Sequence, residues 1–264
     1  MRFRALVLTP FLVLAACGQP AAPTASTTIA ATTTTAATTT APATWFFCDG
    51  VDAPTLMLFT GNGETNSTST MTAYDKSAHG QAAAPVSYTV GEGDGAMGSV
   101  YVPLQQNGQD AGHVRQANPG MFETPGAAYT TPYTSVTLGE KEVRCRWMPR
   151  TRLMGFSTRR TFVINEDADG DLIYTTYDFA DSSKPPIETS DNGETQAYSV
   201  EVRGGHENTT PQGSTFTFTN RGYRYVASVQ NGAAQVQVFE GDKPLLTEPM
   251  IAFTQGTAQA AQNH

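Results

Sequence analysis

Short runs of β-branched and aromatic residues recur along the chain from residue 45 onwards, and clusters of glycine, asparagine and aspartate separate them. No stretch has apolar residues at the 3.6-residue spacing of a helix that packs on a core. Runs of this length with turn residues between them are typical of β-strands. We therefore expect an all-β, mostly antiparallel fold that forms a barrel or a sandwich.

One long segment receives no clear assignment. Gln105–Lys141 contains a single weak strand signal at Ser135–Leu138, and loops of this length in compact domains are usually functional. Asn231-Gly232 is the strongest hairpin signal, because both residues tolerate the positive φ of a two-residue turn. The main strands are predicted at residues 45–48, 54–60, 68–74, 86–90, 99–104, 142–148, 159–165, 172–179, 196–203, 215–219, 223–229, 233–240 and 250–254.

The start of the chain has the features of an export signal. Arg2 and Arg4 precede an apolar run from Ala5 to Leu14, which is about half the length of a membrane-spanning helix. Small residues and a cysteine follow, as Leu14-Ala15-Ala16-Cys17. This stretch resembles the lipobox of bacterial lipoproteins. The resemblance implies cleavage before Cys17, lipidation of that cysteine and attachment to a membrane.

The residue after the cysteine bears on the choice of membrane. Gly18 stands where a signal for inner-membrane retention usually has aspartate. By resemblance to sorting in enteric bacteria, Gly18 implies an outer-membrane lipid anchor that faces the periplasm.

Composition divides the chain into four parts. Residues 1–16 form the expected signal peptide, and 17–44 form the lipidated cysteine with a tether dominated by threonine, alanine and proline. Such a tether cannot build a core and as a flexible coil spans roughly 30 Å. Residues 45–256 form the expected β domain, and the alternative is a division into two subdomains near 180–195. Residues 257–264 are expected to be a disordered tail.

The charge of the chain limits its partners. It has 24 Asp and Glu against 16 Lys and Arg, and the formal net charge of −8 becomes −10 when Arg2 and Arg4 are set aside. This acidity excludes nucleic acid as an expected partner. It favours a basic protein, which long-range attraction would draw to the surface.

The cysteines indicate one disulfide. With Cys17 assigned to lipid, Cys48 and Cys145 remain as a pair in a chain exported to an oxidising compartment. Closing so long a loop stabilises a fold by roughly 4–5 kcal/mol on the chain-entropy model. The alternative is two separately buried thiols.

Half of the lysines and arginines that follow residue 44 lie in Lys141–Arg160. Guanidinium groups suit phosphate and carboxylate, so an anionic envelope component is a candidate ligand. The alternative is that these arginines pair with the protein's own acids. Aromatic residues of the unassigned segment are candidates for contact with a sugar or a protein. The alternative is that their rings cover the core. The candidate ligand-binding residues are Arg144, Arg146, Arg150, Arg152, Tyr129 and Tyr133, with Phe122 beside them.

A second resemblance concerns residues 45–148. Phe46-Phe47-Cys48-Asp49 and Gly98-Ser99-Val100-Tyr101 resemble segments of the membrane-bound lysozyme inhibitors of the MliC type. That family implies a lipid-tethered, disulfide-bearing antiparallel β-barrel and adds Tyr101 to the candidate binding residues. The chain departs from the family in two respects. Met97 stands where the family has its inhibitory serine, and the body is roughly twice as long.

Catalytic motifs are few. The chain has no HExxH, no G-x-S-x-G, no Walker loop and no CxxC. Asn165–Leu172 resembles the front half of a calcium loop, but Thr176 stands where glutamate is required, so a hairpin turn is favoured. We predict no metal or cofactor and favour a non-catalytic binding or structural module of the cell envelope. The alternatives are a lysozyme-inhibitor-like protein and an envelope-active hydrolase.

Overall fold

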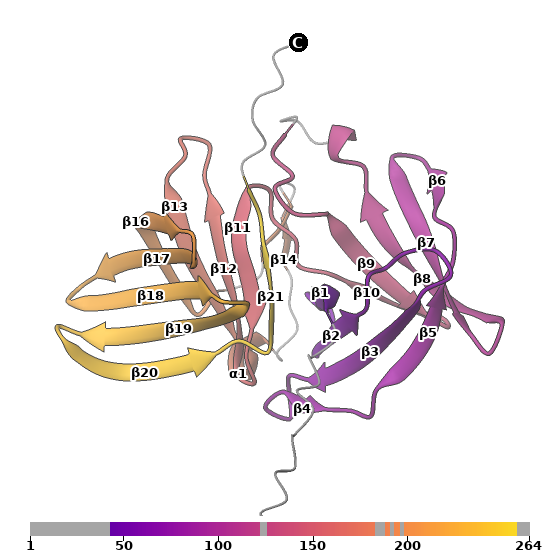
Figure 1. The fold of residues 1–264 in the computed structure, drawn as a ribbon, viewed down its shortest axis with the longest axis horizontal. Coiled ribbons are helices and arrows are strands. Elements are labelled where there is room, and N and C mark those ends of the chain that lie inside the picture. The colour runs from indigo at the N-terminus through magenta and orange to yellow at the C-terminus, as the bar shows by residue number, and fades with distance from the viewer. Residues whose placement is uncertain (1–42, 122–125, 183–187, 191–192, 196–197, 258–264) are drawn as a thin grey trace, which may run out of the picture. The chain divides into compact units, whose positions relative to one another are not determined.

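The computed structural model describes residues 43–121, 126–182, 188–190, 193–195 and 198–257. The expected signal peptide, Cys17, the tether up to residue 42 and residues 258–264 of the expected tail lie outside the described residues. The described residues belong to one compact unit, and nearly all of its regular structure is antiparallel β-sheet (Figure 1). The prediction of an all-β fold is confirmed.

The first sheet is built from the first ten strands. Their path is β1-β2-β3-β5-β7-β8-β9-β10, with β4 beside β3 and β6 beside β7, and the strands are β1 (Thr44–Asp49), β2 (Thr55–Thr60), β3 (Thr68–Asp75), β4 (Gln81–Ala82), β5 (Val86–Val90), β6 (Asp94–Ala96), β7 (Ser99–Gln106), β8 (Gln109–Ala117), β9 (Tyr133–Leu138) and β10 (Lys141–Arg144). The sheet curls until its two ends meet. There Gly50 and Cys145 form an isolated bridge, and Arg146 N donates to Asp49 O at 2.8 Å.

The second sheet has nine strands in the order β20-β19-β18-β17-β16-β13-β12-β11-β21. They are β11 (Thr151–Phe156), β12 (Arg160–Glu166), β13 (Leu172–Asp178), β16 (Val200–Thr210), β17 (Gly213–Asn220), β18 (Tyr223–Gln230), β19 (Ala233–Glu240), β20 (Lys243–Pro249) and β21 (Ala252–Gln255). Only Met250 and Ile251 separate the two edge strands β20 and β21, so this sheet also curls toward itself. Ile251 N donates to Phe156 O at 2.7 Å, at the end of β11, the strand beside β21.

Three small elements complete the described structure. They are a 3₁₀ turn, η1 (Pro119–Met121), a single helical turn, α1 (Phe179–Ser182), and a hairpin of β14 (Glu188–Ser190) and β15 (Gly193–Thr195). The chain passes from the first sheet to the second between β10 and β11. The interruption near 180–195, where the sequence suggested a division, instead connects β13 and β16, which are neighbours in one sheet.

The buried apolar residues form three clusters. One fills the inside of the first sheet and includes Phe59 and Leu104, and another fills the inside of the second sheet and includes Phe216 and Val236. The third joins the sheets, because the outer face of β1 and β2 packs against β11, β12 and β13.

Strand β1 contributes to two of these clusters. Successive side chains of a strand point to opposite faces. Phe46 and Cys48 therefore enter the core of the first sheet, while Phe47 packs 5.1 Å from the ring of Phe156 in the second sheet. Burial on both faces explains why this stretch is a continuous apolar run in the sequence.

Most predicted strands are present, and the Asn231-Gly232 hairpin is confirmed, with φ of 51° and 78°. The prediction missed the longer strands β8, β11 and β20 and the short strands β4, β6, β14 and β15. Strand β8 lies in the segment that received no assignment, because Val114 is its one fully buried side chain among polar and small residues. Asn107-Gly108, with φ of 53° and 73°, forms the turn before β8 and carries the same hairpin signal as residues 231–232.

Candidate functional site

A small pocket lies where the two sheets meet. Its volume is about 90 Å³, well below the roughly 300–1,000 Å³ of pockets that enclose drug-sized ligands. The wall comes from β1, the segment before β9, the segment after β10, and strands β11 and β21. The lining residues are Trp45, Phe46, Phe47, Thr130, Thr131, Tyr133, Arg146, Trp147, Met154 and Thr254.

Hydrogen bonds fix the aromatic wall of the pocket. The register of β1 against β2 shifts between Thr44 and Phe46, and such an irregularity re-aims the side chain of the extra residue, here Trp45. Trp45 Nε1 donates to the hydroxyl of Tyr133 at 2.8 Å, and Trp147 Nε1 donates to Thr130 Oγ1 at 3.1 Å. The Tyr133 ring stacks on Phe46 with 4.3 Å between centroids. The indole rings are thereby held in defined orientations.

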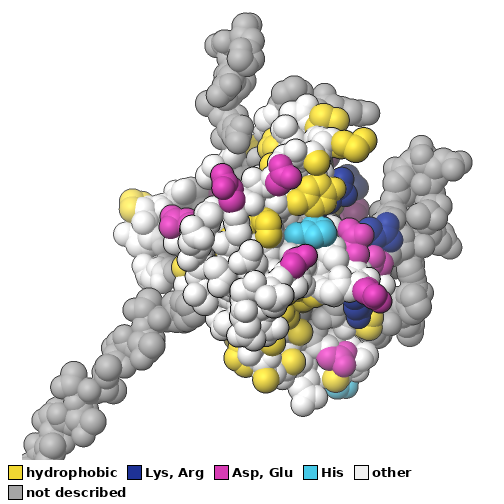
Figure 2. Space-filling model, turned by 90° about the vertical axis from the view of Figure 1, so that its right-hand side faces the viewer, with side chains coloured by type: hydrophobic (Ala, Val, Ile, Leu, Met, Phe, Trp, Pro, Cys, Tyr) yellow, Lys and Arg dark blue, Asp and Glu magenta, His cyan; other side chains and the backbone are white. Residues whose placement is uncertain are grey.

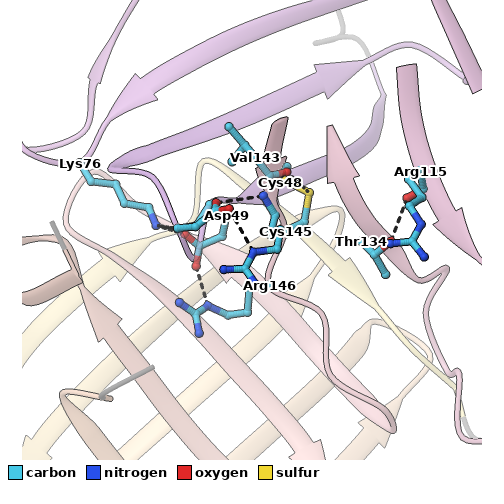
Figure 3. The surroundings of a disulfide bond; sticks show 11 residues. Cys48, Asp49, Lys76, Arg115, Thr134, Val143, Cys145 and Arg146 are labelled. Atoms are coloured by element: carbon cyan, nitrogen blue, oxygen red, sulfur yellow. Dashed lines mark hydrogen bonds and ion pairs between the residues drawn. A yellow bond between two sulfur atoms is a disulfide. The ribbon is translucent and has the colours of Figure 1, made fainter. Parts of the chain in front are cut away.

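Behind this wall lies a buried cluster of three charged side chains. Asp49 at the end of β1 lies between Lys76, which follows β3, and Arg146, which follows β10 (Figure 3). Arg146 Nε lies 2.6 Å from Asp49 Oδ2, and Lys76 Nζ forms an ion pair with Asp49 and donates to Gly50 O at 2.6 Å. The three residues are 0%, 1% and 8% exposed.

The cluster contains one more cation than anion. Burial alone would raise the pKa of the Asp49 carboxyl, but the charges of Lys76 and Arg146 outweigh it and lower that pKa to about 2. Burial lowers the pKa of the Lys76 amine, and the attraction of Asp49 only partly opposes this change. One carboxylate therefore does not fully compensate the two cations in this poorly solvated place.

One nitrogen of the Arg146 guanidinium, Nη2, is not used in the ion pair with Asp49. Its guanidinium carbon lies 3.4 Å from the centroid of the Tyr177 ring, which comes from β13. In the described part of the chain, its buried Nη2 atom has no hydrogen-bond partner. Leaving such a donor unsatisfied costs about 1–3 kcal/mol. Arg146 also lines the pocket, so its guanidinium places a positive charge beside the cavity.

The disulfide sets this geometry. Cys48 and Cys145 are bonded, which confirms their predicted pairing, and 97 residues separate them in sequence. They directly precede Asp49 and Arg146, so the covalent link and the ion pair join the same two segments (Figure 3). Together they close the seam between the two ends of the first sheet.

The four predicted arginines do not share a surface. Arg144 pairs with Asp52 at 3.1 Å with 43% of its side chain exposed, whereas Arg146 is buried. Arg150 Nη1 donates to Asp167 O at 2.7 Å, and Arg152 forms ion pairs with two glutamates. These contacts agree with the alternative interpretation, in which the arginines pair with acceptors of the protein itself.

The predicted aromatic residues also separate. The hydroxyl of Tyr129 donates to Glu166 Oε2 at 2.9 Å, beside the Arg152 ion pairs. Tyr101 lies on β7 with its ring 5.2 Å from His113, and Phe122 lies outside the described residues. Of the predicted ligand-binding residues, Tyr133 and Arg146 are the two that line the pocket.

Sequence reasoning missed most of the site. Trp45 and Asp49 had a signal, because a carboxylate directly after the apolar run Trp45–Cys48 needs a partner when the strand is buried. Lys76 and Trp147 had none. Lys76 meets Asp49 only because β3 lies two strands away from β1 in the curled sheet.

In two other places, a pair of acids shares one arginine. Arg152 bridges Glu166 and Glu207, and Arg160 approaches Asp178 at 3.2 Å and Glu248 at 3.4 Å. Neither group provides the two isolated carboxylates that the hydrolase interpretation requires.

The calcium-like segment forms the turn between β12 and β13. There the Asp167 carboxylate accepts from the backbone N–H groups of Asp169 and Asp171, both at 3.0 Å. Within the described ranges, no group of three His, Cys, Asp or Glu residues is placed to hold a metal.

Comparison of the chain with protein-family models, with curated proteins and with solved structures gave no match. In the part of the chain that the structure describes, no helix has the length and apolar character needed to cross a membrane.

Proposed function

We propose that this chain is a cell-envelope lipoprotein whose β domain binds a small anionic group, without catalysis, in the pocket at Arg146. The lipobox resemblance supports an anchor at Cys17 in the outer membrane, with the β domain in the periplasm. The pocket supports the binding role. The anionic group would belong to an envelope component, and a carboxylate is the class that fits best.

The observation that carries the binding role is the buried, unpartnered Nη2 of Arg146 beside a cavity. A buried polar group without a partner in a native fold calls for an explanation, and an absent ligand is one. A carboxylate would accept from Nη2 in a charge-assisted hydrogen bond and would supply the negative charge that the cluster lacks. The volume of about 90 Å³ admits such a group with a short apolar extension.

The aromatic wall suits that extension. Trp45, Tyr133 and Trp147 offer apolar ring surface, and their polar atoms already have partners within the protein. Small-molecule sites commonly combine a mostly apolar wall with a few placed polar groups. The neutral amide of the same shape would lack the charge and should bind more weakly.

Tryptophan fluorescence tests this function directly, because the chain has two tryptophans and both line the pocket. Propionate should change the emission in a saturable way, and propionamide should have a much weaker effect. Arg146→Met should abolish the response to propionate, whereas Arg144→Met, which alters an arginine outside the pocket, should keep it. Circular dichroism checks that each variant is folded. Equal responses to the acid and the amide would contradict the proposal.

Arg146→Lys is a second variant, for the case in which Arg146→Met does not fold. It keeps the charge beside Asp49 but loses the second arm of the guanidinium, so binding of propionate should weaken while the fold is retained. A folded Arg146→Lys protein with unchanged affinity would also contradict the proposal.

A lysozyme-inhibitor-like role is the second candidate, and the acidic face of the first sheet favours it, although Met97 replaces the inhibitory serine of that family. Met97, in the turn between β6 and β7, is fully exposed and has a positive φ of 48°, and Met121 nearby is 68% exposed. Acidic side chains are spread over the face of the first sheet that Figure 2 shows, which suits a basic partner. A lysozyme assay with the wild type and with Met97→Asp tests this role, since loss of inhibition in the variant is expected.

A further inference from the structure

A second cavity opens at the other side of the first sheet's core. Its volume is about 180 Å³, and it lies between β2 and β3 on one side and β9 and β10 on the other. Met57, Met71, Val136 and Val143 line its inner part and belong to the core cluster of the first sheet. The cavity is therefore an apolar recess at the open end of a curled sheet, a position where ligands commonly bind.

The recess exists because the side chains near its mouth are small. Ala73 on β3 pairs with Met57 on β2, and Thr55 lies two residues before Met57 on the same face of β2. Both small residues are only half-buried. Methionine side chains adapt easily to the shape of an apolar guest. An apolar cavity of about 150 Å³ is sufficient to hold benzene, so this recess can hold a short hydrocarbon group.

One charged residue lines the recess. Lys141 begins β10 and lies two residues before Val143, so the two side chains share the inner face of the strand. Lys141 is exposed, and a lysine in this position lays its hydrocarbon stem over apolar surface while the ammonium stays in water. The mouth of the recess therefore combines apolar surface with a positive charge.

We propose that this recess binds the hydrocarbon chain of an anionic amphiphile, such as a fatty acid, with the headgroup at Lys141. The chain enters the space bounded by Met57, Met71 and Val143, and the carboxylate stays at the solvated rim. This site is separate from the pocket at Arg146 and does not depend on the function proposed for it.

Isothermal titration calorimetry with hexanoate, octanoate and octan-1-ol tests the proposal on the full chain carrying Cys17→Ala. Affinity should rise about fourfold for each added methylene until the recess is full. Octanoate should bind more tightly than octan-1-ol in the wild type, and Lys141→Gln should remove that preference. Lys243→Gln, which alters an exposed lysine on β20, is the matched control and should keep it.

A filling variant tests the location. Ala73→Leu should weaken octanoate binding at least tenfold because the larger side chain occupies the recess, whereas Ala233→Leu, an exposed position on β19, should leave binding unchanged. Saturating propionate, the probe for the pocket at Arg146, should leave octanoate binding unchanged, which separates the two sites. Sedimentation with phosphatidylglycerol vesicles that octanoate competes away would identify membrane lipid as the source of the chain. Absence of octanoate binding, or equal binding to Ala73→Leu, would overturn the proposal.

Discussion

Arg146 Nε donates to Asp49 Oδ2 at 2.6 Å, and the residues directly before these two, Cys145 and Cys48, form the disulfide. The two ends of the curled first sheet are thus joined by a covalent bond and by a buried ion pair at adjacent positions. Because the ion pair is buried, removing one partner should destabilise the protein far more than breaking an ion pair at the surface.

Asp49→Asn should be strongly destabilising. It leaves the charges of Lys76 and Arg146 buried without a counter-charge, and breaking such a pair typically costs about 3–5 kcal/mol. Asp52→Asn is the matched control, because Asp52 pairs with Arg144 where both side chains are partly exposed, and it should cost at most about 1 kcal/mol. Urea unfolding of both variants measures the difference, and equal losses would show that the buried cluster is not under-compensated.

Acid should remove part of this stability. The pKa of Asp49 is lowered from 3.8 to about 2 on folding, so its contribution is complete above pH 3.8 and is lost as the pH falls through about 2. A shift of this size corresponds to about 2 kcal/mol. The free energy of unfolding of the wild type, measured between pH 5 and pH 2, should fall more steeply than that of Asp49→Asn. Parallel curves would contradict this origin of the acid sensitivity.

Reduction of the disulfide should lower the melting temperature markedly. The bond closes a loop of about a hundred residues, and the chain-entropy model assigns such a loop roughly 4–5 kcal/mol. Thermal melts with and without dithiothreitol measure the effect. A protein carrying both Cys48→Ala and Cys145→Ala supplies the control, since the reductant should no longer change its melting temperature.

Cys17→Ala should release the protein from membranes. A single acyl chain holds a protein only marginally, whereas several chains hold it firmly. If Cys17 is lipidated as proposed, its loss should therefore shift the protein to the soluble fraction. Cell fractionation measures this, and Cys48→Ala serves as a control that keeps the lipid. If the Cys17→Ala protein still sediments with membranes, the lipobox interpretation is wrong.

The features of the fold that could be predicted are those with local signals. The β-branched runs, the Asn231-Gly232 turn and the choice of Cys48 and Cys145 each depend on a few neighbouring residues or on a count. Strand β20 was missed because most of its side chains are exposed, and its sequence lacks an alternating apolar pattern. The meeting of β1 with the end of β10 depends on how far the sheet curls, and no residue pattern encodes that amount.

The site was predicted only in part for a related reason. The sequence grouped Arg144, Arg146, Arg150 and Arg152 because they are close in the chain. In the fold, the first sheet ends at Arg144, the backbone turns at Arg150 with a positive φ of 53°, and the second sheet begins at Thr151. The arginines therefore point to different surroundings. The partner that matters most for Arg146, Asp49, is supplied from the opposite end of the first sheet.

The pocket at Arg146 contains Trp45 from the first strand and Thr254 from the last. The ribosome therefore synthesises Trp45 about two hundred residues before Thr254. During synthesis Cys48 and Asp49 therefore emerge long before Arg146, and the pocket is incomplete until β21 has docked. A chain that terminates before Ala252 would keep every buried charge of the cluster and still lack one wall of the site.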